Sequence, residues 1–433
     1  MAVLSSFRSL YFATMLMLLG SGLLSTYLAL QVAERANSLW VGAMMTCFYL
    51  GLVTGGKQGH KLIARVGHIR AYVASAGIVT AATLLHGLLD NLWLWLLLRV
   101  IVGLGMMNLY MVVESWLNEQ STSDERGKVF SGYMMASYLG MVIGQLTLAS
   151  LSDLSLSLLM IVALCFALCL VPVALTRRIH PEPLTPATLS PTYFFRQVPI
   201  SMFTSLLSGT IVGAFYGLAP LYASRIDMPT QQVGLFMASC VAAGLLVQAP
   251  LGYLSDRVDR SKMIRWTSFI LFISAAPLAL DTDWPIITVF TLGSISSALM
   301  FCLYPLAVAF ANDNIPAEKR VSLAAILLTI FGLGASIGPV LVGSLMRGFG
   351  PNMLYAVFSL AALTIVLKVR PQVITGTTQI EEAPLPHTAM PDGLSSSPLA
   401  VALDPRVEEE HVLDQMQECT MEHVAETTEE QHF

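Results

Sequence analysis

The chain has 433 residues, of which 55% are hydrophobic and 12% are charged, and its formal net charge is −5. Soluble domains carry about 25% charged residues, so this composition excludes an ordinary soluble globular protein and favours a membrane protein. Apolar runs of about 18 or more residues are typical of membrane-spanning helices.

Twelve apolar runs follow one another along the chain, and each predicts a membrane-spanning helix. Several contain Gly or Pro, which bundled membrane helices tolerate. An outer-membrane barrel would instead show short segments of alternating polarity, and the sequence has no such pattern. The first run is longer than the apolar part of a signal peptide and lacks a clear A-x-A site, so we expect it to remain as the first span. The expected spans are 10–32, 39–56, 71–89, 92–115, 129–151, 154–176, 198–222, 232–253, 264–280, 285–311, 321–346 and 352–367.

The Lys and Arg residues that flank the spans predict the orientation of the chain. With the N-terminus inside, eighteen of them lie on the inner side and three, Arg35, Arg225 and Arg347, lie on the outer side. This asymmetry places both the N-terminus and the C-terminus in the cytoplasm.

Two polar phrases, "NEQSTSDER" at 118–126 and "NDNIPAEKR" at 312–320, have the same pattern. In each, Asn and an acid are followed by six residues and an Arg. Other short matches recur at a similar offset: Val41-Gly42 returns as Val233-Gly234, 192 residues later. The sequence therefore predicts a tandem duplication of six spans. The acid and Arg of the two phrases are Glu119 with Arg126 and Asp313 with Arg320.

The segments between and after the two sets of spans differ in composition from the spans. The bridge is rich in Pro, Thr and Ser, as linkers are. Residues 371–433 contain thirteen carboxylates and one Arg, which predicts a largely disordered, solvated tail, with a regulatory arm that contacts the basic inner loops as the alternative. The expected organisation is an N-terminal six-helix half over 1–176, a cytoplasmic linker over 177–197, a C-terminal six-helix half over 198–369 and an acidic cytoplasmic tail over 370–433.

Arg99 and Glu114 are charged residues within the fourth apolar run. A charge in hydrocarbon costs at least about 2.5 kcal/mol by insertion scales, so each is a functional candidate. At about 100° per residue they share one helix face with Gly103 and Tyr110, but about 22 Å of helix axis separates them, so they cannot pair.

We expect Glu114 to be a proton-coupling carboxyl, because a carboxyl group inside a helix bundle could take up a proton near neutral pH. The alternative is an interfacial Glu114 that pairs with a basic loop residue such as Arg65. Arg99 is a candidate for contact with an anion or substrate, or for a part in coupling. Its alternative is a packed side chain bonded to backbone carbonyls.

Four stretches resemble the major facilitator superfamily or a group within it. "GYLSDRVDR" at 252–260 is similar to its G-x-L-x-D-R signature, with Asp256 and Arg257 at the charged positions. "RVIVGLG" at 99–105 is similar to its R-x-x-x-G-x-G stretch, and "RVGHIRAY" followed by "VVESWLNE" looks like the YcaD group of bacterial transporters. The resemblance implies an all-α protein of the bacterial inner membrane with twelve transmembrane helices in two six-helix halves related by a pseudo-twofold axis.

The resemblance also implies that the first, fourth, seventh and tenth helices line a central cavity. Each polar residue on these helices has packing within the bundle as its alternative role. The candidates for the substrate cavity are Ser25, Tyr27, Gln31, Asn108, Tyr110, Tyr216, Tyr222 and Tyr304.

In sugar-porter relatives of the superfamily, an acid-x6-Arg pair at these helix ends joins the basic loop signature to latch the cytoplasmic side. The first-half loop here is degenerate, because Ala64 stands where the signature has an acid. The alternative is ordinary charge at a helix end in water. By resemblance, the cytoplasmic gate would consist of Arg65, Arg70, Glu119, Arg126, Asp256, Arg257, Asp313 and Arg320.

These features predict a secondary active transporter that moves a small organic solute by alternating access, with protons as the candidate coupling ion. The alternative is a receptor or scaffold that does not transport and signals through the acidic tail. The sequence contains no Walker loop, H-E-x-x-H, G-x-S-x-G or His/Cys cluster, so we expect no enzyme activity, no cofactor and no metal site. The expected partners are the lipid bilayer and the solute, without nucleic acid, and the expected state is a monomer.

Overall fold

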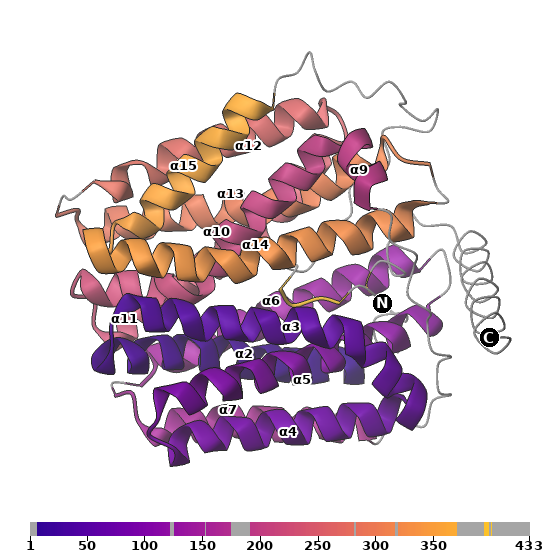
Figure 1. Ribbon diagram of the computed structural model, residues 1–433, viewed down its shortest axis with the longest axis vertical. Coiled ribbons are helices and arrows are strands. Elements are labelled where there is room, and N and C mark those ends of the chain that lie inside the picture. The colour runs from indigo at the N-terminus through magenta and orange to yellow at the C-terminus, as the bar shows by residue number, and fades with distance from the viewer. Residues whose placement is uncertain are drawn as a thin grey trace, which may run out of the picture.

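The computed structural model describes residues 7–121, 125–151, 153–174, 191–280, 283–316, 319–369, 394–397 and 400 (Figure 1). Within these ranges the secondary structure is helical and contains no strand. The first group of helices comprises α2 (Arg8–Arg35), α3 (Ser38–Val66), α4 (His68–Leu88), α5 (Leu92–Glu119), α6 (Arg126–Ala149), α7 (Leu156–Leu168) and α8 (Leu170–Ala174). The second comprises α9 (Pro191–Gln197), α10 (Pro199–Arg225), α11 (Thr230–Ser255), α12 (Arg260–Ala275), the 3-10 turn η1 (Pro277–Ala279), α13 (Ile286–Asn312), α14 (Arg320–Phe349) and α15 (Met353–Lys368).

The two groups form two halves that lie side by side, as the indigo-to-magenta and pink-to-orange helices of Figure 1 show. Among the described helices, ten are long and apolar enough to cross a membrane, with α7 and α8 together making one of them. The shorter α12 and α15 occupy the places of the ninth and twelfth expected spans. The expected all-α fold of twelve helices in two halves is confirmed.

The halves repeat the same internal packing. Helix α6 lies against α2, and its equivalent α14 lies against α10. Both contacts depend on glycines whose missing side chains let backbones approach closely. A Cβ atom at Gly140 or Gly144 would overlap the α2 backbone, and a Cβ atom at Gly334 or Gly338 would overlap the α10 backbone. The small-residue spacing therefore sets the same helix pair in both halves.

Some helices extend beyond the apolar runs that predicted them. The second expected span ends at residue 56, whereas α3 continues to Val66 and ends at Gly67, whose φ of 82° favours glycine. Arg65 thus lies on the last turn of a helix. The reason is that an α-helix continues into water as long as no breaker interrupts it, so hydropathy marks the membrane boundary and not the helix end.

The two ends of the bundle differ. We call the end that carries Arg65, Arg126, Arg257 and Arg320 the basic end, and the other the opposite end. Three hydrogen bonds join the halves, all from the first half of α3, and they extend from Ser38 near the opposite end to Tyr49 at mid-bundle. Ser38 Oγ donates to the Gly343 carbonyl at 2.8 Å, Thr46 Oγ1 to the Ser336 carbonyl at 2.7 Å and Tyr49 Oη to the Gly213 carbonyl at 3.2 Å.

Candidate functional site

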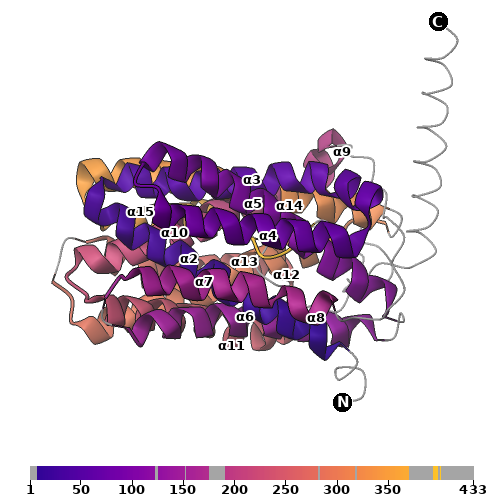
Figure 2. The same cartoon turned by 90° about the horizontal axis from the view of Figure 1, so that it is seen from below.

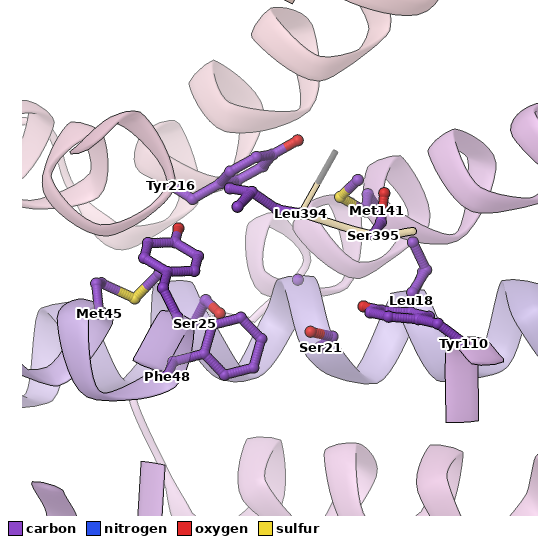
Figure 3. Close-up of a pocket in the computed structure, with 12 residues that line it drawn as sticks. Leu18, Ser21, Ser25, Met45, Phe48, Tyr110, Met141, Tyr216, Leu394 and Ser395 are labelled. Carbon is purple, nitrogen blue, oxygen red and sulfur yellow. The ribbon is translucent and has the colours of Figure 1, made fainter. Parts of the chain in front are cut away.

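A cavity lies at the centre of the bundle, between the halves (Figure 3). Figure 3 shows the hydroxyl groups of Ser21 and Tyr110 on one side and Tyr216 on the other. The free volume is about 40 Å³, room for roughly three water molecules. The walls come from α2, α3, α5, α6 and α10 and from two residues of the C-terminal tail: Leu18, Ser21, Gly22, Ser25, Met45, Phe48, Tyr49, Tyr110, Met141, Tyr216, Leu394 and Ser395.

Glu114 of α5 lies toward the basic end from this cavity and has no exposed surface. Its carboxylate accepts hydrogen bonds from Tyr133 Oη at 2.9 Å, Ser396 Oγ at 2.9 Å and the Ser397 backbone N–H at 3.0 Å to each oxygen. The Ser397 hydroxyl also donates to it. All of these donors are neutral. Among the described residues, therefore, no cation compensates the buried carboxylate charge.

The contact with the tail differs from the sequence expectation for this region. The composition of "GLSSSP" predicts part of a disordered tail, but Leu394, Ser395, Ser396 and Ser397 are each less than 9% exposed. Figures 1 and 2 show this short yellow segment among the helices. The remainder of the tail, apart from residue 400, lies outside the described residues. Serines carry little hydropathy signal, so only the tertiary contact with Glu114 reveals the position of the segment.

Arg99 lies on the other side of the cavity and is 1% exposed. Its Nη2 is 3.4 Å from Ser25 Oγ and 3.4 Å from Met45 Sδ, and its guanidinium carbon is 4.4 Å from the centre of the Phe48 ring. All three contacts line the cavity. No carboxylate among the described residues pairs with Arg99, so the cavity has a buried cation at one side and a buried anion at the other.

The other cavity candidates divide into two groups. Ser25, Tyr110 and Tyr216 line the cavity. The remaining five are not among the lining residues. Tyr222 packs its ring against Tyr355 at 4.9 Å, Tyr304 packs against Phe331 at 4.7 Å, and Gln31 donates to the Leu154 carbonyl at 3.1 Å. Asn108 faces Gly59 of α3, and Tyr27 is buried.

Comparison with known proteins agrees with this architecture. The family model of the Major Facilitator Superfamily matches residues 10–290 and 231–403. The chain is 30% identical over 357 residues to a protein of Shigella flexneri serotype 5b and to one of Escherichia coli K12 (strain DH10B). Each alignment covers 82% of this chain and 92% of the relative, and both relatives are described as "Uncharacterized MFS-type transporter YcaD".

The chain belongs to the major facilitator superfamily. Solved structures with the same fold include the nucleoside transporter NupG, with a TM-score of 0.69 and 15% identity over 85% of this chain and 98% of that one. A second is the D-xylose-proton symporter, with a TM-score of 0.68 and 16% identity over 86% of this chain and 99% of that one. This member of the superfamily is a multi-pass membrane transporter.

The signature of the superfamily in the second half forms an ion cluster at the basic end. Arg260, 3% exposed, donates to Asp313 at 2.6 Å, to Asp256 at 2.9 Å and to the Ala309 carbonyl at 2.9 Å. Asp256 and Asp313, two of the gate candidates, thus accept hydrogen bonds from the same side chain. The cation between them is Arg260, however, whereas Arg257 is exposed and lies over the Tyr253 ring at 4.2 Å.

The equivalent place in the first half has different chemistry. At the 192-residue offset that relates Arg65 to Arg257, His68 corresponds to Arg260. His68 is buried, and its Nε2 lies 3.0 Å from Ser115 Oγ of α5. Both residues therefore anchor the start of a helix to the basic end of its neighbour, one with a permanent cation and one with an imidazole.

The remaining gate candidates are distributed unevenly. Arg65 and Arg70 are exposed, whereas Arg126 and Arg320 are 5% and 3% exposed. The side chain of Glu119 lies outside the described part of the structure. In the described ranges no group of three or more His, Cys, Asp or Glu side chains could hold a metal ion.

Arg99 allows a test that separates function from packing in this superfamily member. We expect Arg99→Met to leave the melting temperature unchanged or higher, because an apolar side chain replaces an unpaired buried charge, while solute transport falls at least about tenfold. Thermal unfolding in detergent and proteoliposome uptake measure the two effects. Arg35→Met, at an exposed Arg that pairs with Asp90, is the control and should change neither. A lower melting temperature for Arg99→Met would assign Arg99 to packing instead.

Proposed function

We propose that the chain is a secondary active transporter that moves a small organic solute by alternating access and couples this movement to a proton bound at Glu114. We place it in the bacterial inner membrane with both termini in the cytoplasm, so the basic end faces the cytoplasm. The proposal assigns it no enzymatic reaction.

The observation that carries this proposal is the Glu114 carboxylate, fully buried beside a central cavity and surrounded only by neutral donors. A buried charge without a counterion is expensive, since its effective desolvation penalty is several kcal/mol. Binding of a proton removes that charge. The free energy of this helix arrangement therefore differs between the ionised and the protonated form of Glu114. Such a difference is what a coupling site requires, because a ligand shifts a conformational equilibrium only by its differential interaction with the two states.

The packing between the halves supports alternating access. Hydrogen bonds from Ser38, Thr46 and Tyr49 join the halves from the opposite end inward to the central cavity. Residues 394–397 of the tail lie among the helices (Figure 2), in the wall of the central cavity and against Glu114 on the side of the cavity that faces the basic end. We assign this arrangement to a state in which the outer side is closed. The D-xylose-proton symporter among the fold neighbours is an instance of the same fold in a proton-coupled transporter.

The test is accumulation of radiolabelled solutes in proteoliposomes with an imposed proton gradient, using a panel of pentoses, nucleosides and carboxylates. We expect Glu114→Gln to abolish accumulation above equilibrium, because an amide cannot exchange the proton. Exchange of labelled for unlabelled solute, which needs no net proton movement, should persist. The matched control is Glu34→Gln, at an exposed position of α2, which should accumulate solute normally. Gradient-driven accumulation by Glu114→Gln would refute the coupling role.

A further inference from the structure

The segment Leu394–Ser397 lies between the central cavity and Glu114. It contributes Leu394 and Ser395 to the wall of the central cavity, and Figure 3 shows both residues between Tyr216 and Tyr110. Its next two residues bind the carboxylate of Glu114. Tyr133 connects the two regions, because its hydroxyl lies within hydrogen-bond distance of both the Glu114 carboxylate and the Ser395 carbonyl, at 2.9 and 3.2 Å.

We propose that Leu394–Ser397 is an intramolecular competitor that occupies the solute site at Glu114, and that the solute is an uncharged molecule with neighbouring hydroxyl or N–H groups. This inference rests on the proposed function, since it treats the central cavity as the solute site.

The donors of the segment define what the site recognises. Two hydroxyl groups and one backbone N–H reach the two carboxylate oxygens of Glu114 from adjacent residues. A carboxylate can accept about four hydrogen bonds and prefers donors in its plane. A polyhydroxylated solute offers the same set of adjacent donors. The segment carries no Lys or Arg, so the site holds its occupant through hydrogen bonds and not through an opposite charge.

The small free volume of the central cavity supports competition between the segment and a solute. With the segment in place, the cavity retains about 40 Å³, which holds a few water molecules but no organic solute. Leu394, which is 8% exposed, lies beside Met141 and Tyr216 in Figure 3. The apolar side chain therefore fills the centre, while the serines satisfy the carboxylate. A solute can enter only when the segment leaves.

The experiment measures access to the cavity in the full-length chain. A thiol is introduced by Ser21→Cys, at a residue of the cavity wall, in a background whose six native cysteines are replaced. Its rate of reaction with N-ethylmaleimide in detergent is compared between chains with the native tail and chains with Ser396→Ala/Ser397→Pro, which lack both hydroxyl groups and the N–H. We expect the rate to rise about tenfold or more, because each lost bond to a charged group is worth roughly that factor.

Two controls make the comparison specific. Ser344→Ala removes the hydroxyl of an exposed serine on α14, away from the cavity wall, and should leave the rate near that of the native chain. Ser150→Cys, an exposed thiol at the opposite end, should react equally fast with either tail. Ser397→Glu is a second opening variant, because like charges would meet at Glu114, and it should raise the rate as well. An unchanged rate in both opening variants would overturn the proposal.

The solute class is tested in the opened variant. We expect D-xylose or uridine, both rich in neighbouring hydroxyl groups, to protect the thiol again, and tetramethylammonium, a cation without donors, to leave it reactive. Protection by tetramethylammonium, or by none of the three, would overturn the assigned class. Labelling needs no transport, so its result stands whether or not Glu114→Gln keeps gradient-driven accumulation. The two proposals can therefore fail separately.

Discussion

Arg260→Met is expected to destabilise the folded protein by about 3–5 kcal/mol, the range found when one partner of a buried ion pair is removed. Arg260 binds two carboxylates and one carbonyl while its side chain is 2% exposed. Its removal leaves Asp313, with a side chain 11% exposed, next to Asp256 without the shared cation. The melting temperature in detergent, followed by loss of the monodisperse chromatographic peak, measures the effect.

Two further variants test whether the loss of stability in Arg260→Met comes from the buried ion cluster. Arg257→Met removes a cation of the same signature that is exposed and stacked on Tyr253, and exposed pairs contribute only about 0–1 kcal/mol, so it should change the melting temperature little. Asp313→Asn in the Arg260→Met background removes one of the two carboxylates that shared Arg260 and should recover part of the loss, as coupled neighbours do. Equal effects of Arg257→Met and Arg260→Met would contradict the assignment of the cluster to Arg260.

Gly334→Ala is expected to lower stability by about 1–3 kcal/mol or more, the range for overpacked interiors. A methyl group there would overlap the Leu206 carbonyl oxygen and come within 2.9 Å of the Thr210 backbone nitrogen. Both atoms belong to the backbone of α10, so relief requires movement of a whole helix. Folded yield and the melting temperature in detergent measure this loss.

The same helix contains its control. Gly348 of α14 is exposed, and a methyl group at its Cα would meet no atom within 4 Å. Ala is intrinsically better than Gly in a helix by about 1 kcal/mol, so Gly348→Ala should be neutral or slightly stabilising. Both substitutions add one methyl group to α14. A loss of stability for Gly334→Ala without a loss for Gly348→Ala would show that Gly334 is required by the close approach of α14 to α10 and not by helix propensity. An equal change in stability for the two variants would refute this explanation.

The fold was predictable because its signals are local. Twelve apolar runs are long enough to count from hydropathy, and the offset of 192 residues between Val41-Gly42 and Val233-Gly234 reveals two halves. The helix ends were not predictable from hydropathy, as the continuation of α3 to Val66 shows. Helix ends depend on breakers and caps, which follow other rules than membrane burial does.

The functional site was predictable only in part. Arg99 and Glu114 are recognisable because a charge in an apolar run is conspicuous. Ser396 and Ser397 lie 282 and 283 residues from Glu114, and no periodicity links such distant polar residues. Arg260 is easily missed because the signature draws attention to Arg257. Its signal is its place at the start of α12, next to Asp259, whose side chain caps that helix.

The cavity charges occur in one half only, and this has a consequence for energetics. At the 194-residue offset of the two polar phrases, Val308 and Gly293 stand where the first half has Glu114 and Arg99. The helical scaffold is thus duplicated, whereas the charged residues beside the cavity occur only in its first half. Under the proposed mechanism the stoichiometry at this site is one proton per cycle. One charge moved through 100 mV supplies about 2.3 kcal/mol, which limits accumulation of a neutral solute to about fiftyfold for each 100 mV of driving force.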